Sequence, residues 1–325
     1  MSLVKLRFSM LVTLAVIIGV STLFFAFVLT MVEAFDILTL VVFVAGFNIL
    51  QWLMAPFLID LMYQTRQVSP QEQPELYQIV QRVSQRSNLP VPRIMVANLP
   101  IPNAFAYGSP VAGTRVAVTS GLLRTLEAEE VEAVLAHELG HIKHRDVQIM
   151  MFVSVLPAIL YYVGYSLSMQ SSYGRDRNRS SGFALVGALS MVSYFVLTFL
   201  SLWLSRLREY YADRHAVQVV DDGARKLQEA LAKIVTYTGR VRVTNRVRVT
   251  NQPYGLSSFK SLYISDPDTA ERDYQEIHYS SSGTYDNELV NNILSRKTSG
   301  FETIAELFST HPNIIKRLRA LEQLR

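Results

Sequence analysis

The sequence predicts a mainly α membrane protein with four transmembrane helices and a polar α+β domain that contains a small antiparallel sheet. Three observations lead to this prediction. The chain of 325 residues contains four long runs without a charged residue, three short strand-like runs between turns, and an amphipathic stretch with two histidines four residues apart. This length allows one large domain or two modest ones.

The four apolar runs are residues 8–32, 37–59, 147–174 and 180–205, and none of them contains Asp, Glu, Lys or Arg. Each run is long enough to cross a bilayer as a helix, which takes about 20 residues. A buried helix in a soluble core is the alternative for any single run, but four such runs in one chain favour a membrane. The first run is longer than the apolar part of a signal peptide, so we expect a retained anchor.

These runs divide the chain into four parts. Residues 1–60 form a transmembrane hairpin of spans one and two, and residues 147–205 form a second hairpin of spans three and four. Residues 61–146 and 206–325 are polar. If both polar parts lie on one side of the membrane, they form the two halves of a single domain.

The distribution of basic residues indicates the orientation in the membrane. The formal net charge is only +4, and we expect no nucleic-acid partner. Basic residues cluster near the membrane ends of the N-terminus and of both polar parts, which places these parts in the cytoplasm. The residues that favour this orientation are Lys5, Arg7, Arg66, Lys143, Arg145, Arg206 and Arg208, and those that oppose it are Arg175, Arg177 and Arg179.

Cysteine is absent from the chain. This absence excludes a disulfide framework, a thiolate metal site and a cysteine nucleophile. It also fits a domain that faces a reducing interior.

The first polar part predicts two helices around three strands. A helix starts near Ser69-Pro70, and its apolar positions recur at helical spacing (Leu76, Ile79, Val80 and Val83). The runs "RIMVAN" at 93–98, "NAFAYGS" at 103–109 and "TRVAVT" at 114–119 read as strands. Thr125 is a candidate cap for the second helix, with glutamates in its first turn. No Gly or Pro separates the end of this helix from span three, so we expect it to run straight toward the membrane.

The second polar part begins with a helix that continues span four and a further helix from about Asp221. The repeat "RVRVTNRVRVTN" at 240–251 alternates in polarity and predicts a small amphipathic hairpin. Its basic residues fit either an anionic partner or a solvated strand face, and the second is favoured. Residues 252–300 are polar with little periodicity and predict a loop-rich segment. A last helix starts with Pro312 in its first turn.

The stretch "HELGH" at 137–141 matches the zincin signature. His137 and His141 lie one helical turn apart and face the same way, and Glu138 is placed to take a proton from an attacking water. A surface histidine pair is the alternative. His144 is one turn further on, where a solvated position is favoured over a ligand role. Val147 stands where the metzincin pattern requires a third histidine, so the third ligand must come from elsewhere.

The motifs around this helix resemble the HtpX-type integral membrane zinc metalloproteases, gluzincin-like relatives of the CAAX prenyl endoproteases. The resemblance covers nearly the whole chain in order, except residues 240–300, which match nothing in the family pattern. It rests on "HELGHIKHRD" at 137–146, two hydrophobic spans, "SRLREYYADRHA" at 205–216, "PNAFAYG" at 102–108, "VAVTSGLL" at 116–123 and "LFSTHPNIIKRL" at 307–318.

The resemblance implies a role for each matching residue. His137, His141 and Glu209 would bind one Zn²⁺ per chain, and Glu138 would be the general base. Asp213, four residues after Glu209, would orient a ligand histidine.

The resemblance also implies residues that act on the substrate. His311 would stabilise the developing oxyanion, although a helix-capping histidine is an equal alternative. Arg317 would help to position the site or the substrate, with a structural ion pair as the alternative. The run Asn103, Ala104, Phe105 and Ala106 would be an exposed edge strand that pairs with an extended substrate.

The sequence therefore predicts a multi-pass cell-membrane zinc endopeptidase with a zincin-like catalytic domain in the cytoplasm. Its partners would be polypeptide substrates and the lipid bilayer. The resemblance implies quality control of damaged or misfolded membrane proteins. Two alternatives stay open, a prenyl-protein endopeptidase and a non-catalytic zinc-binding membrane scaffold. Four spans argue against the first, and the intact Glu138 argues against the second.

Overall fold

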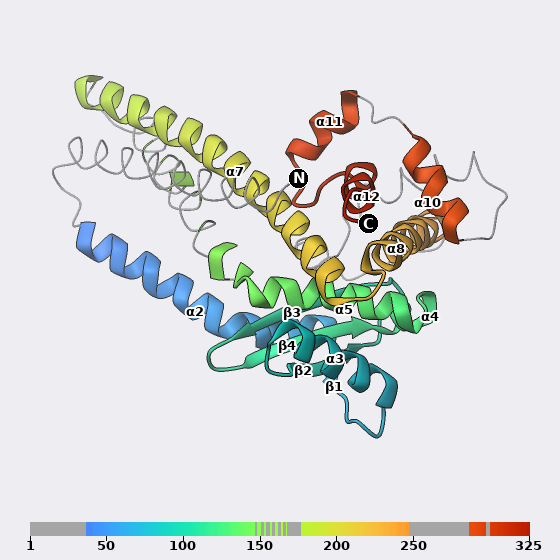
Figure 1. Ribbon diagram of the computed structural model, residues 1–325. Coiled ribbons are helices and arrows are strands. Elements are labelled where there is room, and N and C mark those ends of the chain that lie inside the picture. Colours follow the sequence, from blue (N-terminus) through green and yellow to red (C-terminus); the bar gives the residue numbers. More distant parts are fainter. Residues whose placement is uncertain are drawn as a thin grey trace. The chain divides into compact units, whose positions relative to one another are not determined.

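The computed structural model describes most of the polar parts of the chain and half of the apolar ones (Figure 1). It describes residues 37–146, 177–246, 286–296 and 300–325, and scattered positions between 148 and 167. The chain divides into two compact units, each discontinuous in sequence. Unit 1 comprises Met1–Trp52 and Gln148–Leu207, and unit 2 comprises Leu53–Val147 and Arg208–Arg325.

Unit 1 contains the first part of helix α2 (Ile37–Tyr63) and most of helix α7 (Arg177–Val219). Ala184–Val219 is the one helix among the described residues that is long and apolar enough to cross a membrane. Val153 and Leu160 pack against Leu197 and Leu204 on α7. The first predicted span lies outside the described residues, as does most of the third, so the number of four spans stays a prediction.

Unit 2 is built around a four-stranded sheet in the order β1-β2-β4-β3. The predicted strands are confirmed as β2 (Arg93–Ala97), β3 (Ala104–Ser109) and β4 (Gly113–Thr119), and a short β1 (Thr65–Gln67) adds to them. The prediction of an antiparallel sheet is wrong, because β2 pairs with β4 in parallel. β3 and β4 form an antiparallel hairpin, and β4 is the strand of that hairpin that lies next to β2. It runs in the same direction as β2.

The two faces of the sheet are both covered, as expected when apolar residues occupy successive positions of a strand. On β2, Ile94 and Val96 belong to the larger core with α3 (Pro74–Ser87) and α5 (Ala128–Lys143). The alternate residues join a smaller core with the last turns of α2. That smaller core contains Ile59, Tyr63, Met95, Ala97, Phe105, Tyr107 and Ala117.

The helices of the first polar part start later than the sequence predicts. Helix α3 begins at Pro74, four residues after the expected Ser69-Pro70 start, because Pro74 occupies the first helical position. Helix α5 is capped by Glu127 and not by Thr125, since Glu127 and Glu130 form a reciprocal capping box. Thr125 instead ends a short helix α4 (Ser120–Thr125), which the sequence did not predict.

Helix α5 does not run straight on toward the membrane. It ends at Lys143 with His144 as its C-cap, and Arg145 adopts the left-handed conformation with φ of 56°. The chain therefore turns sharply after the helix that carries the histidine pair. The continuous helix predicted from the lack of Gly and Pro is wrong at this point.

The second polar part is helical throughout its described residues. Helix α8 (Gly223–Arg246) confirms the helix predicted near Asp221, but it extends into the repeat for which we predicted a hairpin. That prediction is wrong for residues 240–246, where helix propagation overrides a short alternating pattern. The rest of the repeat and residues 252–285 lie outside the described residues. The remaining helices are α10 (Asp286–Ser295), α11 (Gly300–Leu307) and α12 (Ile314–Glu322). The loop-rich segment predicted at 252–300 is therefore wrong at Asp286–Ser295, which is helical.

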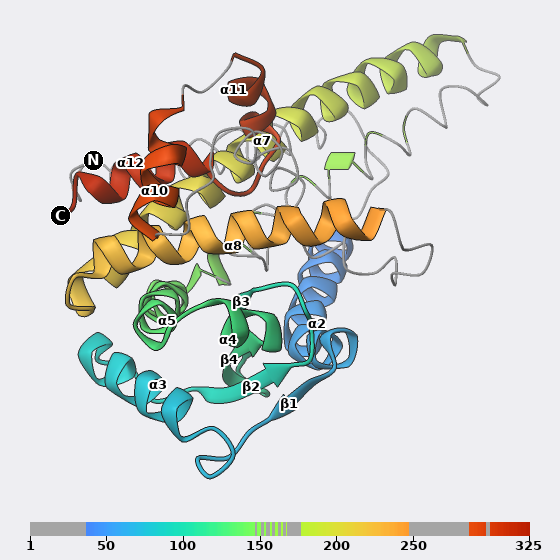
Figure 2. The same ribbon diagram turned by 90° about the vertical axis from the view of Figure 1, so that its right-hand side faces the viewer.

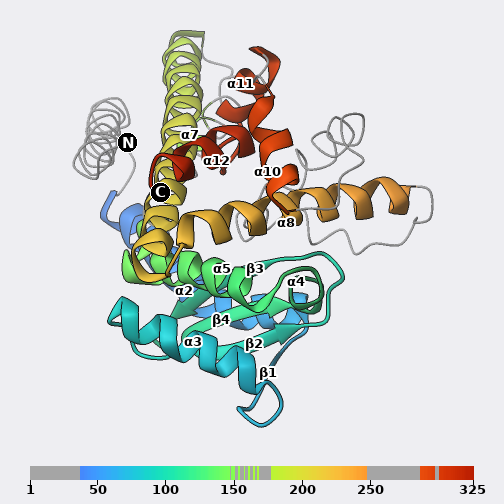
Figure 3. The same ribbon diagram turned by 45° about the vertical axis from the view of Figure 1, so that its right-hand side comes forward.

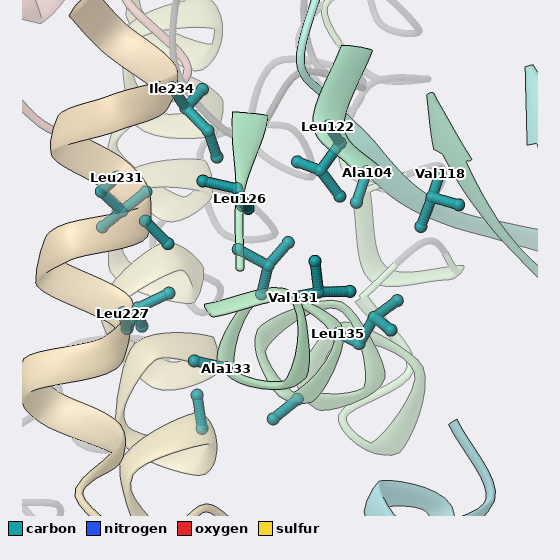
Figure 4. Packing of buried hydrophobic residues seen from close by; sticks show 14 of the residues in the cluster. Ala104, Val118, Leu122, Leu126, Val131, Ala133, Leu135, Leu227, Leu231 and Ile234 are labelled. Atoms are coloured by element: carbon teal, nitrogen blue, oxygen red, sulfur yellow. The ribbon is translucent and has the colours of Figure 1, made fainter. Parts of the chain in front are cut away.

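Helix α5 lies between the sheet and α8 (Figures 2 and 3). Figure 4 shows Leu227, Leu231 and Ile234 of α8 directed toward the side chains of α5 and toward Leu126. Leu135, Leu227 and Leu231 are fully buried there, and burial of a leucine side chain contributes about 1.5–3 kcal/mol. The helix with the histidine pair is thus held on two sides, which fixes the direction of its polar side chains.

Candidate metal centre

Helix α5 presents two histidine side chains toward the same point. His137 is fully buried and His141 is partly buried. Their Nε2 atoms lie 3.2 Å apart, and the two rings are nearly perpendicular. This geometry follows from the spacing of four residues, which places both side chains on one face of the helix, one turn apart.

Glu209, which α7 contributes, completes the group. Its Oε2 lies 3.5 Å from His137 Nε2, and its Oε1 lies 3.4 Å from His141 Nε2. The side chain is buried, and Oε2 has no hydrogen-bond partner in the described part of the chain. Among the described residues, these three are the one group of His, Cys, Asp and Glu atoms close enough together to hold a metal ion.

The spacing of the three atoms fits a zinc ion. Zinc binds nitrogen and oxygen at about 2.0–2.1 Å in a tetrahedral arrangement, which puts neighbouring ligand atoms about 3.3–3.4 Å apart. The distances of 3.2, 3.4 and 3.5 Å between His137 Nε2, His141 Nε2 and the Glu209 carboxylate are close to this value. Two imidazoles and one carboxylate also leave a fourth coordination position open. The donor set therefore fits a hydrolytic metal site.

Glu138 lies beside this group and is not a member of it. Its Oε2 accepts a hydrogen bond of 3.1 Å from the backbone N–H of Ala106 on β3. Burial raises the pKa of the Glu138 carboxyl above its ordinary value, although the neighbouring histidines oppose this shift. A carboxylate held in this position between the helix and the edge strand has the environment of a general base.

Asp213 and Arg317 lie behind His137. Asp213 Oδ1 is 2.9 Å from His137 Nδ1, and Arg317 binds both oxygens of Asp213 at 2.7 and 2.6 Å. Arg317 is 2% exposed and also lies 3.3 Å from Glu209 Oε2. The structure thus places Arg317 in a buried ion pair with Asp213 and close to Glu209.

His311 also lies at the group. Its Nε2 is 3.8 Å from Glu209 Oε1, and its Nδ1 is 2.9 Å from Thr310 Oγ1. The alternative of a helix cap is wrong, because Asn313 caps α12 through its side-chain oxygen. Helix α12 accordingly starts at Ile314, two residues after the predicted Pro312.

Residues Ala104–Ala106 form the start of β3, at the outer edge of the sheet, and Asn103 directly precedes it. The backbone of Asn103 exchanges bonds with Thr119 on the β4 side, while the N–H of Ala106 points away from β4 to Glu138. Because backbone groups alternate along a strand, the N–H and C=O groups of Ala104 and Ala106 both face away from β4. The prediction that this strand is exposed is wrong, because Ala104 is 1% exposed and Ala106 is 8% exposed. Phe105 points into the smaller core and is 2% exposed.

Asp146 and Arg208 were not predicted to lie at this site. Asp146 Oδ2 lies 2.6 Å from His141 Nδ1, and Asp146 Oδ1 lies 3.1 Å from Arg208 Nε. Burial lowers the pKa of His141, but its bonds to Asp146 and Glu209 outweigh burial and raise that pKa to about 10. The sequence feature that could have identified Asp146 is its place as the acidic residue just after the histidine pair.

His144 is not in the metal group, and its ring lies edge-on against that of Tyr211.

A helix with two histidines and a glutamate, facing an acidic residue on a second helix, is the arrangement of a metallopeptidase. Residues 70–325 match the profile of peptidase family M48. The chain is 39% identical over 283 residues to a "Protease HtpX homolog" of Thermoplasma acidophilum, which covers 86% of this chain and 82% of the relative. It is 34% identical over 339 residues to "Protease HtpX homolog 2" of Saccharolobus solfataricus, with 99% and 98% coverage.

The fold is also similar to that in the crystal structure of S. mikatae Ste24p. The TM-score is 0.52 at 18% sequence identity, over 98% of this chain and 67% of that chain. The family match and the curated relatives together establish the family. The chain belongs to peptidase family M48 and is an HtpX-type metalloprotease.

Proposed function

We propose that this M48 protease is a multi-pass membrane zinc endopeptidase that cleaves membrane or misfolded proteins on the cytoplasmic side. The observation that carries the proposal is the separation of His137 Nε2, His141 Nε2 and the Glu209 carboxylate by 3.2, 3.4 and 3.5 Å. These three residues would hold one Zn²⁺ per chain. A bound zinc ion would supply Lewis-acid chemistry that activates water and the scissile carbonyl.

Glu138 is the general base in this proposal. Its carboxylate accepts the proton of the attacking water and delivers it to the departing amine. The raised pKa of Glu138 supports this role, because a base with a pKa nearer to neutrality also releases its proton readily. The N–H of Ala106 holds one carboxylate oxygen, which leaves the other free to face the water.

The edge of β3 that faces away from β4 is the proposed substrate-binding surface. An extended peptide would add to this edge as a further strand and bond the backbone of Ala104 and the carbonyl of Ala106, whose N–H already donates to Glu138. The bond from Ala106 to Glu138 supports the assignment, because it brings the edge to the general base. A substrate strand would therefore lie with its backbone beside the group that carries out the cleavage.

His311 and Arg317 have supporting roles in this proposal. The Nε2 of His311 lies on the Glu209 side of the group and would donate to the developing oxyanion. Arg317 holds Asp213, which in turn holds the ring of His137. Its burial and its two bonds to Asp213 support a positioning role over direct contact with the substrate.

The membrane setting rests on the apolar runs of the sequence and on the length and hydropathy of Ala184–Val219. Lipid and membrane-protein substrates are the partners that this setting favours. The positive-inside tendency supports a cytoplasmic catalytic domain.

Purified protein in detergent tests the proposal through two measurements on the same samples. Metal analysis should give one zinc per chain, and cleavage of an unprenylated membrane-protein substrate should stop when a chelator is added. Glu138→Gln should keep the zinc and lose the cleavage. Cleavage that requires a prenyl group would favour a prenyl-protein endopeptidase. A zinc-loaded wild type that cleaves no substrate would favour a scaffold.

A further inference from the structure

The turn after α5 brings one acidic side chain back to the metal centre. In a continuous helix, residue 146 would lie about 140° around the axis from His141, because each residue adds about 100°. The left-handed conformation of Arg145 breaks the helix. The turn is fixed by backbone bonds from His144 to Gly140 and from Arg145 to Ile142, both of 3.1 Å. Asp146 then reaches His141, five residues before it in the chain.

Asp146 is almost completely buried, at 1% exposure. An isolated buried carboxylate is costly, so its partners must compensate for the lost hydration. The partners are His141 Nδ1, hydrogen-bonded at 2.6 Å, and Arg208 Nε, which forms an ion pair at 3.1 Å without hydrogen-bond geometry. Arg208 is itself buried and directly precedes Glu209 on α7. The contact therefore joins the end of α5 to the segment of α7 that carries the acidic member of the metal group.

The same pattern occurs at the other histidine. Asp213 contacts His137 Nδ1, and Arg317 binds Asp213. The Nδ1 atom of each histidine thus contacts one buried aspartate, and each aspartate pairs with one buried arginine. The His141 side chain is 14% exposed, against 1% for His137, so packing alone restrains its ring less.

We propose that Asp146 is the positioning residue for His141. It accepts the Nδ1–H of the ring, which leaves the lone pair of Nε2 directed toward His137 and Glu209. Arg208 holds Asp146 in place. Because Arg208 directly precedes Glu209 on α7, this contact also fixes the position of Glu209 relative to the end of α5. This inference rests on the proposed zinc site and extends it by two residues that do not touch the metal.

Asp146→Asn is the main test, made in the full-length protein in detergent. Zinc affinity is measured by competition with a fluorescent chelator, since loss of a hydrogen-bond partner behind a ligand histidine typically weakens metal binding about 10–100-fold. We expect a loss in that range. At saturating zinc, kcat should fall while KM stays close to that of the wild type. The visible spectrum of the cobalt-substituted variant should also change, because the ring of His141 is no longer fixed.

Two control variants separate positioning from a structural role. Asp222→Asn removes the charge of an exposed aspartate that pairs with Arg225 and should leave zinc affinity unchanged. Arg145→Gly keeps Asp146 and removes the strain of the left-handed residue, so it should also leave zinc affinity unchanged. Arg208→Gln should weaken zinc binding in the same direction as Asp146→Asn but less strongly.

A zinc affinity within twofold of the wild type in folded Asp146→Asn protein would overturn the inference. If that variant does not fold, Arg208→Gln decides by the same criterion. Either result would leave the zinc site itself standing, provided that the wild type binds one zinc. A wild type that binds no zinc would instead contradict the proposed function.

Discussion

The histidine pair illustrates how much one residue depends on its neighbours. His137 and His141 occupy equivalent positions on α5, yet their Nδ1 atoms contact aspartates from different parts of the chain, Asp213 on α7 and Asp146 after the turn. His311 approaches the same group from the segment before α12. The side chains that surround the metal group thus come from three regions of unit 2, and each can be tested separately.

His311→Ala tests the donor at the oxyanion. We expect turnover to fall on the order of 10²-fold, because removal of one oxyanion donor has this effect, while zinc content stays at one per chain. The measurement is kcat beside metal analysis on the same preparation. Unchanged turnover would show that His311 has only a packing role.

Arg317→Met tests the buried ion pair behind His137. Removal of the guanidinium leaves the buried charge of Asp213 uncompensated, which typically costs about 3–5 kcal/mol. Thermal melting should therefore show a large loss of stability. The exposed pair of Arg66 with Glu72 supplies the control, since Arg66→Met should barely change the melting temperature. Equal effects of the two variants would contradict the role assigned to Arg317.

The site residues differ in how far the sequence alone predicts them. The residue types and spacing of His137, Glu138 and His141 predict a metal site by themselves, whereas Glu209 and Asp213 required the family resemblance. Asp146 was missed because its contact depends on the turn at Arg145, and nothing in the local pattern forbids a continuous helix there. Glycine is the usual residue at a left-handed position, so the arginine at position 145 did not indicate that the helix ends there.

At the scale of elements, the close approach of α5 and α7 brings the two histidines to Glu209. Gly140 lies between His137 and His141 and faces α7. A Cβ atom at this position would lie 3.2 Å from Ala212 Cα and 3.2 Å from His215 Cβ. The glycine of the motif thus allows the backbones of the two helices to approach.

Gly140→Leu tests this packing. The larger side chain should push α5 away from α7, reduce stability by about 1–3 kcal/mol and weaken zinc binding. Thermal melting and chelator competition measure the two effects. Gly182→Ala is the matched control on α7, because a Cβ there meets nothing within 4 Å. Wild-type zinc affinity in folded Gly140→Leu protein would show that the helices need not approach so closely.

The elements themselves were predicted unevenly. Strands β2, β3 and β4 followed from their β-branched and alternating runs, but their order in the sheet did not. Pairing depends on contacts between distant residues, and the alternation of side chains carries no information about which strand is the neighbour. The hairpin predicted from the repeat is wrong at residues 240–246 for a different reason, because a four-residue alternation is too short to oppose an established helix such as α8.

At the scale of the whole molecule, both compact units are discontinuous in sequence, and α2 and α7 each belong to both. Sequence reasoning could predict the polar and apolar parts because charge separates them along the chain. Membrane topology is the property at this scale that a single experiment can address.

Single cysteines measure the topology without background, because the native chain has none. A cysteine at Arg177, between the third and fourth predicted spans, should react with an impermeant reagent from the outer side only. A cysteine at the exposed Val91 should react from the cytoplasmic side only. Labelling of position 177 from the cytoplasmic side alone would overturn the proposed orientation.

The central claim is that Glu209 completes a zinc site with His137 and His141. Zinc stoichiometry of purified Glu209→Ala protein tests it most directly, because removal of the carboxylate leaves only two of the three proposed ligands. We expect zinc far below one per chain after dialysis, together with loss of cleavage, in a protein that remains folded. One tightly bound zinc per chain in Glu209→Ala would contradict the claim.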